Sequence, residues 1–276
     1  MPFVKLMNRS QCLVPSLDLV QRTLATDVAY TTSRMKVLER LPGNPISIAY
    51  RRIGETAVAL MSRLPAFSRV VGLRAGDEHH IEPVVHWYRE HGIKPTFEMV
   101  PGHYDAKLGR ELTRLNFFQS GFHVSLIGEP GHLDDARDDA DIEQVSTPEV
   151  MDDYLHAYVE GWGIADKDQQ RFKANVRPWR EQPGWWLYLA RINGKPAAAA
   201  TLFVQDGVGY LADAATTPAM RNRGLQTALL KRRISDARAA GVDVVFSGAA
   251  PFSTSHRNME RIGLRVQFVR SLWTGA

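Results

Sequence analysis

The feature that most constrains the fold of this chain is a glycine-containing loop between two apolar runs. The run before it, residues 208–215, predicts a β-strand, and the run after it, residues 225–240, has the apolar spacing of an amphipathic helix. Such a loop leaves the first backbone N–H groups of the helix without partners inside the helix, at the positive end of the helix dipole. Arg221 and Arg223 add formal charge. The sequence therefore predicts an anion site here, of the kind that binds a pyrophosphate.

The loop alone does not establish a cofactor site, because an ordinary strand–turn–helix connection with a solvated basic turn has the same pattern. The segments around it carry more information. Residues 242–246 predict a buried strand, residues 253–264 a short capped helix that stops at glycine, and residues 265–273 a final strand. Upstream, residues 185–205 predict a hairpin turning at Asn193-Gly194, and a helix opens at Thr147-Pro148 and runs to residue 158.

The loop sequence 221–226, Arg-Asn-Arg-Gly-Leu-Gln, resembles the coenzyme A signature of the GNAT N-acetyltransferase superfamily, Arg/Gln-x-x-Gly-x-Gly/Ala. Gln226 departs from that pattern, because Gly or Ala is usual there. The order of elements is also similar to the conserved second half of a GNAT domain. The resemblance covers residues 141–276, for which it implies a catalytic GNAT domain.

The first half of the chain repeats this order without the loop. Helices are predicted at 16–40, 78–91 and 106–118, and strands at 46–53, 57–64, 68–73, 95–100 and 122–127. We interpret this as a divergent internal duplication, with Asp77 and Glu78 where an anion would have to bind. The expected fold is α/β (α+β), with two GNAT-like domains, each a mixed, largely antiparallel sheet flanked by helices. Residues 1–135 form the degenerate domain, and residues 129–141, rich in Gly and Asp, are the expected linker.

The resemblance implies acetyl-CoA (coenzyme A) as co-substrate and direct transfer to a small amine in a ternary complex. In the family, pantetheine lies along the bulged strand before the loop, and backbone N–H groups hold the acetyl oxygen. The implied cofactor contacts are Ala214, Ala215, Thr216, Arg221, Asn222, Arg223, Gly224, Leu225, Gln226, Thr227 and Asn258.

Catalytic side chains are harder to assign. The thiolate leaving group must gain a proton, and the family's common general-acid tyrosine corresponds here to Met259, which cannot donate one. Ser255 is an alternative partner for the thiolate, although a serine there is equally a helix cap. Asp213 is the nearest carboxylate in the sequence, although strand alternation could point it away from the cofactor.

Two classes of function remain open. The first is an acyltransferase, a GNAT-type N-acetyltransferase. The second is a non-catalytic acyl-CoA-binding or regulatory module, which Met259 and Gln226 favour. A third hypothesis, a tandem transferase that uses aminoacyl-tRNA as Fem-type enzymes do, is opposed by the lack of a large basic patch. Basic residues are scattered over a chain of net charge +4, so we expect no nucleic-acid partner, and we interpret Lys231-Arg232-Arg233 as a solvated face that could also meet the 3′-phosphate of coenzyme A.

The remaining sequence features concern disulfides, the expected location in the cell and possible metal binding. A single cysteine, Cys12, excludes an internal disulfide framework. No signal peptide and no apolar run of about 18 residues is evident, so we expect a cytoplasmic protein without a membrane partner, with a homodimer left open. The segment 79–86 contains His, Glu and His but lacks the order of a metal motif, so no metal is expected. Trp162 and Trp179 could be core residues or part of an acceptor pocket.

Overall fold

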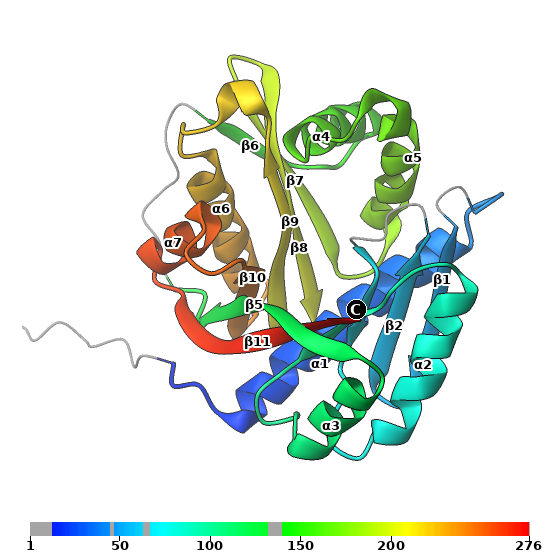
Figure 1. The fold of residues 1–276 in the computed structure, drawn as a ribbon. Coiled ribbons are helices and arrows are strands. Elements are labelled where there is room, and N and C mark those ends of the chain that lie inside the picture. The colour runs from blue at the N-terminus through cyan, green and yellow to red at the C-terminus, as the bar shows by residue number, and fades with distance from the viewer. Residues whose placement is uncertain (1–12, 45–46, 63–66, 132–139, 276) are drawn as a thin grey trace, which may run out of the picture.

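The computed structural model describes residues 13–44, 47–62, 67–131 and 140–275. In these residues the strands form one 11-stranded sheet in the order β1–β2–β3–β4–β11–β5–β10–β9–β8–β7–β6, and helices flank it (Figure 1). Most neighbouring strands are antiparallel, and only the β3–β4 and β9–β10 pairs are parallel. The fold is therefore the mixed, largely antiparallel α/β architecture that the sequence predicts.

In its described residues, the N-terminal half supplies three helices and five strands to this arrangement. They are α1 (Leu17–Glu39), β1 (Ile48–Ile53), β2 (Thr56–Met61), β3 (Arg69–Val71), α2 (Glu78–Glu90), β4 (Thr96–Met99), α3 (Ala106–Arg114) and β5 (Phe117–Gly128). The C-terminal half follows with β6 (Asp141–Gln144), α4 (Pro148–Gly161), α5 (Asp166–Val176), β7 (Trp185–Ile192), β8 (Lys195–Gln205), β9 (Val208–Thr216), α6 (Leu225–Ala239), β10 (Val244–Ala249), α7 (Thr254–Arg261) and β11 (Arg265–Gly275).

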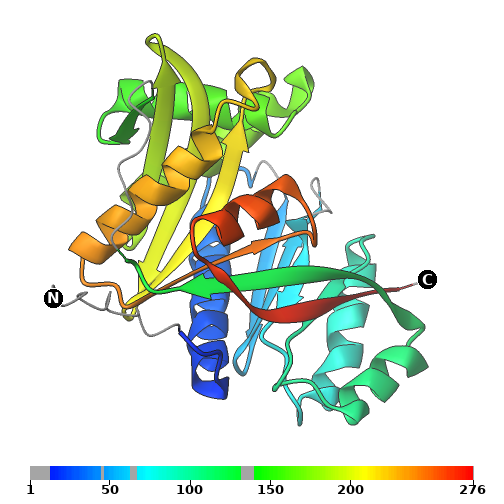
Figure 2. The same cartoon turned by 90° about the vertical axis from the view of Figure 1, so that its left-hand side faces the viewer.

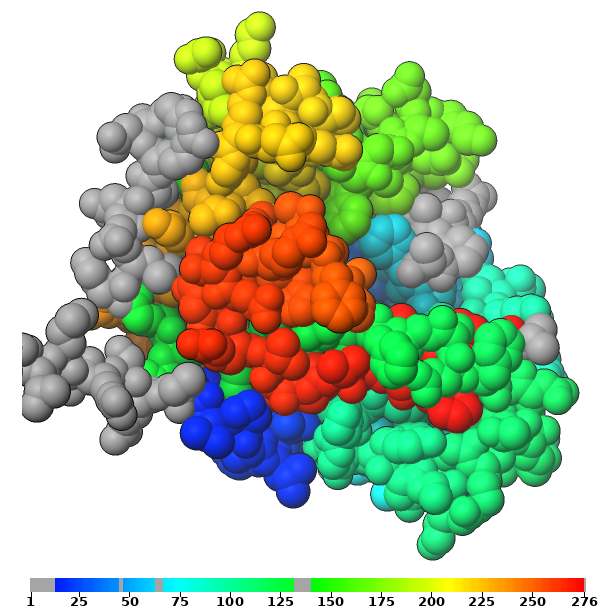
Figure 3. Space-filling view, turned by 60° about the vertical axis from the view of Figure 1, so that its left-hand side comes forward, coloured from blue at the N-terminus to red at the C-terminus, as the bar shows by residue number. Residues whose placement is uncertain are grey.

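The two halves exchange their last strands. Strand β5 of the N-terminal half pairs with β10, and strand β11 of the C-terminal half pairs with β4. The two exchanged strands also pair with each other along nearly their whole length, and Figures 2 and 3 show them side by side, β5 in green and β11 in red. The halves are thus repeats in element order, but they share one continuous sheet.

Helix α1 lies across both halves. It packs on β1 and β2 of the N-terminal half and on β8 and β9 of the C-terminal half. Its side chains accordingly join apolar clusters on both sides: Val20, Leu24 and Val28 pack with Phe268, whereas Tyr30 belongs to the cluster around α4. Burial of these apolar residues stabilises the contact between the halves, at about 25 cal/mol for each Å² removed from water.

Local sequence signals place most element boundaries. The side chains of Ser16, Asp105, Thr147 and Ser253 each accept a hydrogen bond from a backbone N–H in the first turn of their helices, as N-cap residues do. The predicted helix 106–118 ends early, because Asn116 takes a left-handed φ of 62° and β5 begins at Phe117. Helix α5 and strand β6 were not predicted.

Some predictions fall partly or wholly on residues that the structure does not describe. Residue 46 of the first predicted strand, residues 63–64 of the second, Cys12, and residues 132–139 of the predicted linker lie outside the described ranges. The division into domains at residues 135 and 141 stays a prediction.

Candidate active site

The predicted anion loop connects β9 to α6 as expected. A short 3₁₀ helix, Pro218–Met220, follows β9, and Gly224 is the N-cap of α6 with a left-handed φ of 74°. Among the residues that the structure describes, no side chain caps this helix, so its first N–H groups face the loop without a side-chain partner. Residues 221–224 are exposed, and the Arg221 guanidinium donates to the carbonyl oxygens of Thr216 and Gly161, at 3.3 and 3.2 Å.

Strand β9 carries a bulge immediately before this loop. Ala212 pairs with Thr201 and Ala215 with Ala199, so Asp213 and Ala214 lie opposite the single residue Ala200. Asp213 takes a left-handed φ of 45°, an unusual backbone conformation for a residue other than glycine. A bulge re-aims side chains and removes backbone groups from the strand ladder. This explains why simple alternation did not predict the direction of Asp213.

Gln226 connects the start of α6 to α7. Its side-chain amide donates to Ser255 Oγ at 2.7 Å and accepts from Asn258 Nδ2 at 2.8 Å. The structure therefore brings together three residues that the sequence placed in the site separately. The departure of Gln226 from the family signature has a structural role, because an alanine or glycine could form neither hydrogen bond.

Three neighbouring cavities extend from the loop into the molecule. The loop cavity, about 220 Å³, is lined by Trp162, Ala214, Arg221 and Gln226 among others. The middle cavity, about 230 Å³, shares Trp162, Ala214 and Gln226 with it and also touches Ser255 and Met259. The large cavity, about 490 Å³, shares His123, Tyr210, Asp213 and Gly248 with the middle one. Shared walls place the three in a row, with the bulge at their centre.

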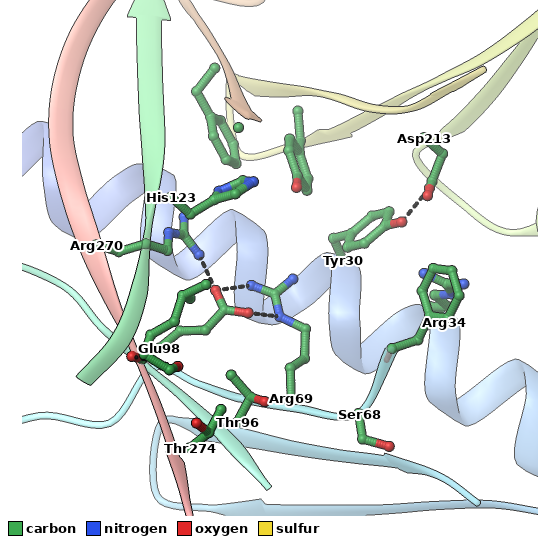
Figure 4. A pocket seen from close by; sticks show the side chains of 16 residues that line it. Tyr30, Arg34, Ser68, Arg69, Thr96, Glu98, His123, Asp213, Arg270 and Thr274 are labelled. Carbon is green, nitrogen blue, oxygen red and sulfur yellow. Dashed lines mark hydrogen bonds and ion pairs between the residues drawn. The ribbon is translucent and has the colours of Figure 1, made fainter. Parts of the chain in front are cut away.

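Both halves of the chain line the large cavity, as Figure 4 shows. Helix α1 contributes Tyr30 and Arg34, β3 and β4 contribute Arg69 and Glu98, and β5 contributes His123. The C-terminal half contributes side chains from β9, β10 and β11.

Comparisons with known proteins agree with this geometry. Residues 147–263 match the model of the acetyltransferase (GNAT) family. These residues form a GNAT-family domain. No curated protein matches the chain. Among solved structures, a GCN5-related N-acetyltransferase from Kribbella flavida has a TM-score of 0.62 at 15% identity, covering 90% of this chain and 95% of that chain.

Two further structures have the same fold over most of their length. A tandem GNAT protein from the clavulanic acid biosynthesis pathway has a TM-score of 0.58 at 12% identity, covering 95% of this chain and 96% of that chain. A protein of unknown function from Staphylococcus epidermidis has a TM-score of 0.58 at 16% identity, covering 83% of this chain and 94% of that chain. The tandem arrangement of two GNAT-like units that the sequence indicated is thus confirmed.

A buried quartet of charges joins strand β11 of the C-terminal half to the N-terminal half. Asp27 pairs with Arg69 at 3.0 Å and with Arg270 at 2.9 Å, and Glu98 pairs with the same two arginines at 2.7 and 2.6 Å. Burial alone would raise the pKa of Asp27, but the two guanidinium groups outweigh it and lower that pKa to about 2. The pKa of Glu98 is lowered for the same reason. The quartet is therefore ionised and electrically balanced.

A second polar group lies beside the bulge. The Tyr30 hydroxyl donates a short hydrogen bond to the Asp213 carboxylate. Burial, together with the Asp213 charge, raises the pKa of Tyr30 well above its usual value, so the phenol remains protonated. The Arg34 guanidinium lies over the rings of Phe67 and Trp179, at 5.4 and 4.8 Å from their centroids. Asp213 is thus held by α1, a contact that sequence reasoning could not foresee.

Arg233 corrects the interpretation of 231–233 as a solvated face. Its side chain is fully buried, and its guanidinium donates to the carbonyl oxygens of Thr201 and Ala212 at 2.7 and 3.1 Å. These carbonyls belong to the strand pair that flanks the bulge, so Arg233 stabilises the bulge from the side of the sheet that α6 covers. Burial lowers the pKa of Arg233 to about 10. The register of the helix, with apolar neighbours at 229, 230 and 234, turns this one basic residue inward.

Of the two tryptophans whose role the sequence left open, one lies in the core and the other lines the cavities. Trp179 is fully buried in the aromatic cluster of the GNAT domain, whereas Trp162 is 43% exposed and lines the loop and middle cavities. Within the described ranges, no group of three or more His, Cys, Asp or Glu side chains is arranged to hold a metal ion. No helix in those ranges is long and apolar enough to cross a membrane.

Proposed function

We propose that the protein is an acetyl-CoA-dependent N-acetyltransferase that acetylates a small amine by direct transfer in a ternary complex. The observation that carries the proposal is the row of three cavities, which runs from the anion loop, past the bulge of β9, to a polar chamber lined by both halves. The pyrophosphate of coenzyme A would bind at the uncapped start of α6, where N–H groups, the helix dipole and Arg221 favour an anion. The amine would occupy the large cavity.

The bulge is the expected place of reaction. The attacking amine nitrogen forms a bond to the thioester carbonyl carbon, and negative charge develops on the carbonyl oxygen. Backbone N–H groups of the bulge, which lies between the paired residues Ala212 and Ala215, are suited to stabilise that charge. Arg233 and Tyr30 hold the bulge in this conformation from two sides. Collapse of the adduct then breaks the carbon–sulfur bond and releases the coenzyme A thiolate.

A non-catalytic acyl-CoA-binding module is the alternative. It is favoured by Met259, which is buried in the core and supplies no proton at the usual tyrosine position. The two functions differ in one measurement, the release of free thiol from acetyl-CoA with a panel of primary amines. An enzyme releases thiol in step with acetylated amine, and Gly224→Asp removes this release. Binding of one acetyl-CoA per chain without amine-dependent thiol release would support the module instead.

A further inference from the structure

One histidine at the junction of the cavities has no part in the function proposed so far. His123 lies on β5, the exchanged strand of the N-terminal half, opposite Arg270 of β11. It lines both the middle and the large cavity, and Figure 4 shows it on the cavity side of the β5 ribbon. It therefore lies where a thioester arriving from the loop would meet an amine in the large cavity.

The ring of His123 is positioned by a glycine on the neighbouring strand. A Cβ atom added to Gly248 of β10 would lie 2.6 Å from His123 Cε1 and 3.1 Å from Nδ1. A side chain at position 248 would consequently displace the imidazole. Within the described residues the His123 ring has no hydrogen-bond partner, and the residue lines the middle and the large cavity.

Three other polar side chains of the middle cavity, Asp213, Tyr210 and Ser255, are less suited to accept a proton. The Asp213 carboxylate already accepts the hydrogen bond from Tyr30. Burial raises the pKa of Tyr210 far above neutral pH, so its hydroxyl stays protonated. Ser255, in the middle cavity, accepts from Gln226.

The surroundings of His123 keep its imidazole neutral. Burial lowers its pKa below the usual 6.5, and Arg270 of β11 acts in the same direction. Arg69 of β3 also lowers the pKa of His123, whereas the carboxylates of Glu98 on β4 and Asp27 on α1 raise it. A neutral imidazole carries the lone pair that a proton acceptor needs at neutral pH.

We propose that His123 is the catalytic base that accepts the proton of the attacking amine. The inference rests on the proposed acetyl transfer. As the nitrogen–carbon bond forms, the nitrogen becomes positively charged, and its proton passes to a ring nitrogen of His123. When the carbon–sulfur bond breaks, the imidazolium gives this proton to the thiolate sulfur. The products are the acetamide and free coenzyme A thiol, and the neutral histidine is restored. One side chain thus serves as base and then as acid, which accounts for transfer with methionine at position 259.

The test compares the full-length protein with His123→Gln, which keeps a polar side chain of similar reach. With an amine that the wild type acetylates, we expect kcat/KM to fall about 10²–10⁴-fold, as for loss of a general base. Acetyl-CoA affinity and the thermal unfolding temperature should stay unchanged. His86→Gln is the matched control: that histidine is 74% exposed on α2, and its replacement should leave the rate unaltered.

The pH profile separates a base from a structural residue. Below pH 6.5 the wild-type kcat/KM should decline with two protonations, that of the amine and that of His123, whereas His123→Gln should retain only the decline from the amine. Gly248→Ala, which displaces the ring, should also lower the rate, yet have little further effect in the His123→Gln background.

Two different failures are distinguishable. Wild-type protein that binds acetyl-CoA but acetylates no amine would overturn the proposed function and this inference together. Active wild type with an unchanged rate, or with the same pH profile, in His123→Gln would overturn the role of His123 alone.

Discussion

The two halves of the molecule contain the same strand–loop–helix unit, but different residues lie at the N-terminus of its helix, α2 in one half and α6 in the other. In the N-terminal half, the Asp77 carboxylate accepts the backbone N–H of Arg74 at 3.1 Å, and the Glu78 carboxylate accepts that of Gly76 at 3.2 Å. In the C-terminal half, Gly224 caps α6 without a side chain. Neither helix has a side-chain cap among the described residues, so the two loops differ in charge: Asp77 and Glu78 place carboxylates at the start of α2, whereas the first turn of α6 has no acidic residue. We therefore expect an anion to bind at the start of α6 and not at the start of α2.

The two halves differ in the charge at these helix starts, but they are joined in structure. Each half completes the other's part of the sheet with its last strand, and α1 and the charge quartet cross between them. The N-terminal half has kept the packing surface of the repeat. Through His123, Arg69 and Glu98 it also supplies part of the large cavity.

The largest expected effect comes from separating the halves. Length alone predicts that residues 141–276, about 135 residues, fold in isolation. The strand exchange argues against that expectation: the fragment leaves β10 without β5 and β11 without β4 and β5. We expect no cooperative thermal transition by circular dichroism, and partial recovery in residues 115–276, which retain β5. A fragment 141–276 that melts cooperatively and binds acetyl-CoA with full affinity would show that the halves are independent.

The next effect concerns the anion loops directly. Gly224→Asp places a carboxylate where the pyrophosphate is expected, at a position of left-handed φ. We expect acetyl-CoA binding to be lost by isothermal titration calorimetry, with one site per chain in the wild type. Gly76→Asp is the matched control in the N-terminal loop, also at a left-handed glycine with open space around it. A wild-type stoichiometry near two, or loss of binding in the control, would mean that both loops bind the cofactor.

The charge quartet tests how strongly the halves are joined. Asp27→Asn removes one charge from a buried network, and we expect the free energy of unfolding to fall by about 3–5 kcal/mol. Asp243→Asn breaks another ion pair between the halves, Arg22–Asp243, which is 33% and 60% exposed, so its cost should stay below about 1 kcal/mol. Denaturant titrations measure both changes. Equal costs would mean that the loss of the Asp27 charge leaves no uncompensated charge in the buried network.

The difference in stability between the wild type and Asp27→Asn should depend on pH. The pKa of Asp27 is lowered from 3.8 to about 2 on folding, so its contribution to stability is present above pH 3.8 and is lost as the pH falls toward 2. The stability difference between wild type and Asp27→Asn should therefore shrink over that interval. A difference that is constant from pH 6 to pH 2 would contradict the lowered pKa.

The smallest effects are expected at the two residues that the sequence offered as catalytic. Asp213→Asn keeps an acceptor for Tyr30, and Ser255→Ala leaves Gln226 bonded to Asn258. Each should lower kcat by less than about 100-fold, below the range of a true acid or base. Steady-state kinetics at saturating acetyl-CoA measure this. If either substitution abolished turnover while acetyl-CoA affinity stayed intact, that residue rather than His123 would carry the proton.

Local sequence was sufficient for most of the elements, though not for α5 and β6, and for the position of the loop between β9 and α6. Caps, glycines and apolar periodicity act over a few residues, so Ser16, Thr147 and the segment 221–226 could be interpreted without knowledge of the fold. The repeat of element order was visible for the same reason.

The rest of the site depends on residues far apart in the chain. Asp213 meets Tyr30 from α1, Arg270 pairs with Asp27 and Glu98, and His123 reaches the cavity only because β5 inserts between β10 and β11. Strand pairing depends on which edges meet in the folded sheet, and no local pattern in 117–128 distinguishes pairing with β4 from pairing with β10. The burial of Arg233 is a consequence of the same packing, because its charge is tolerated only where the bulge offers carbonyl oxygens.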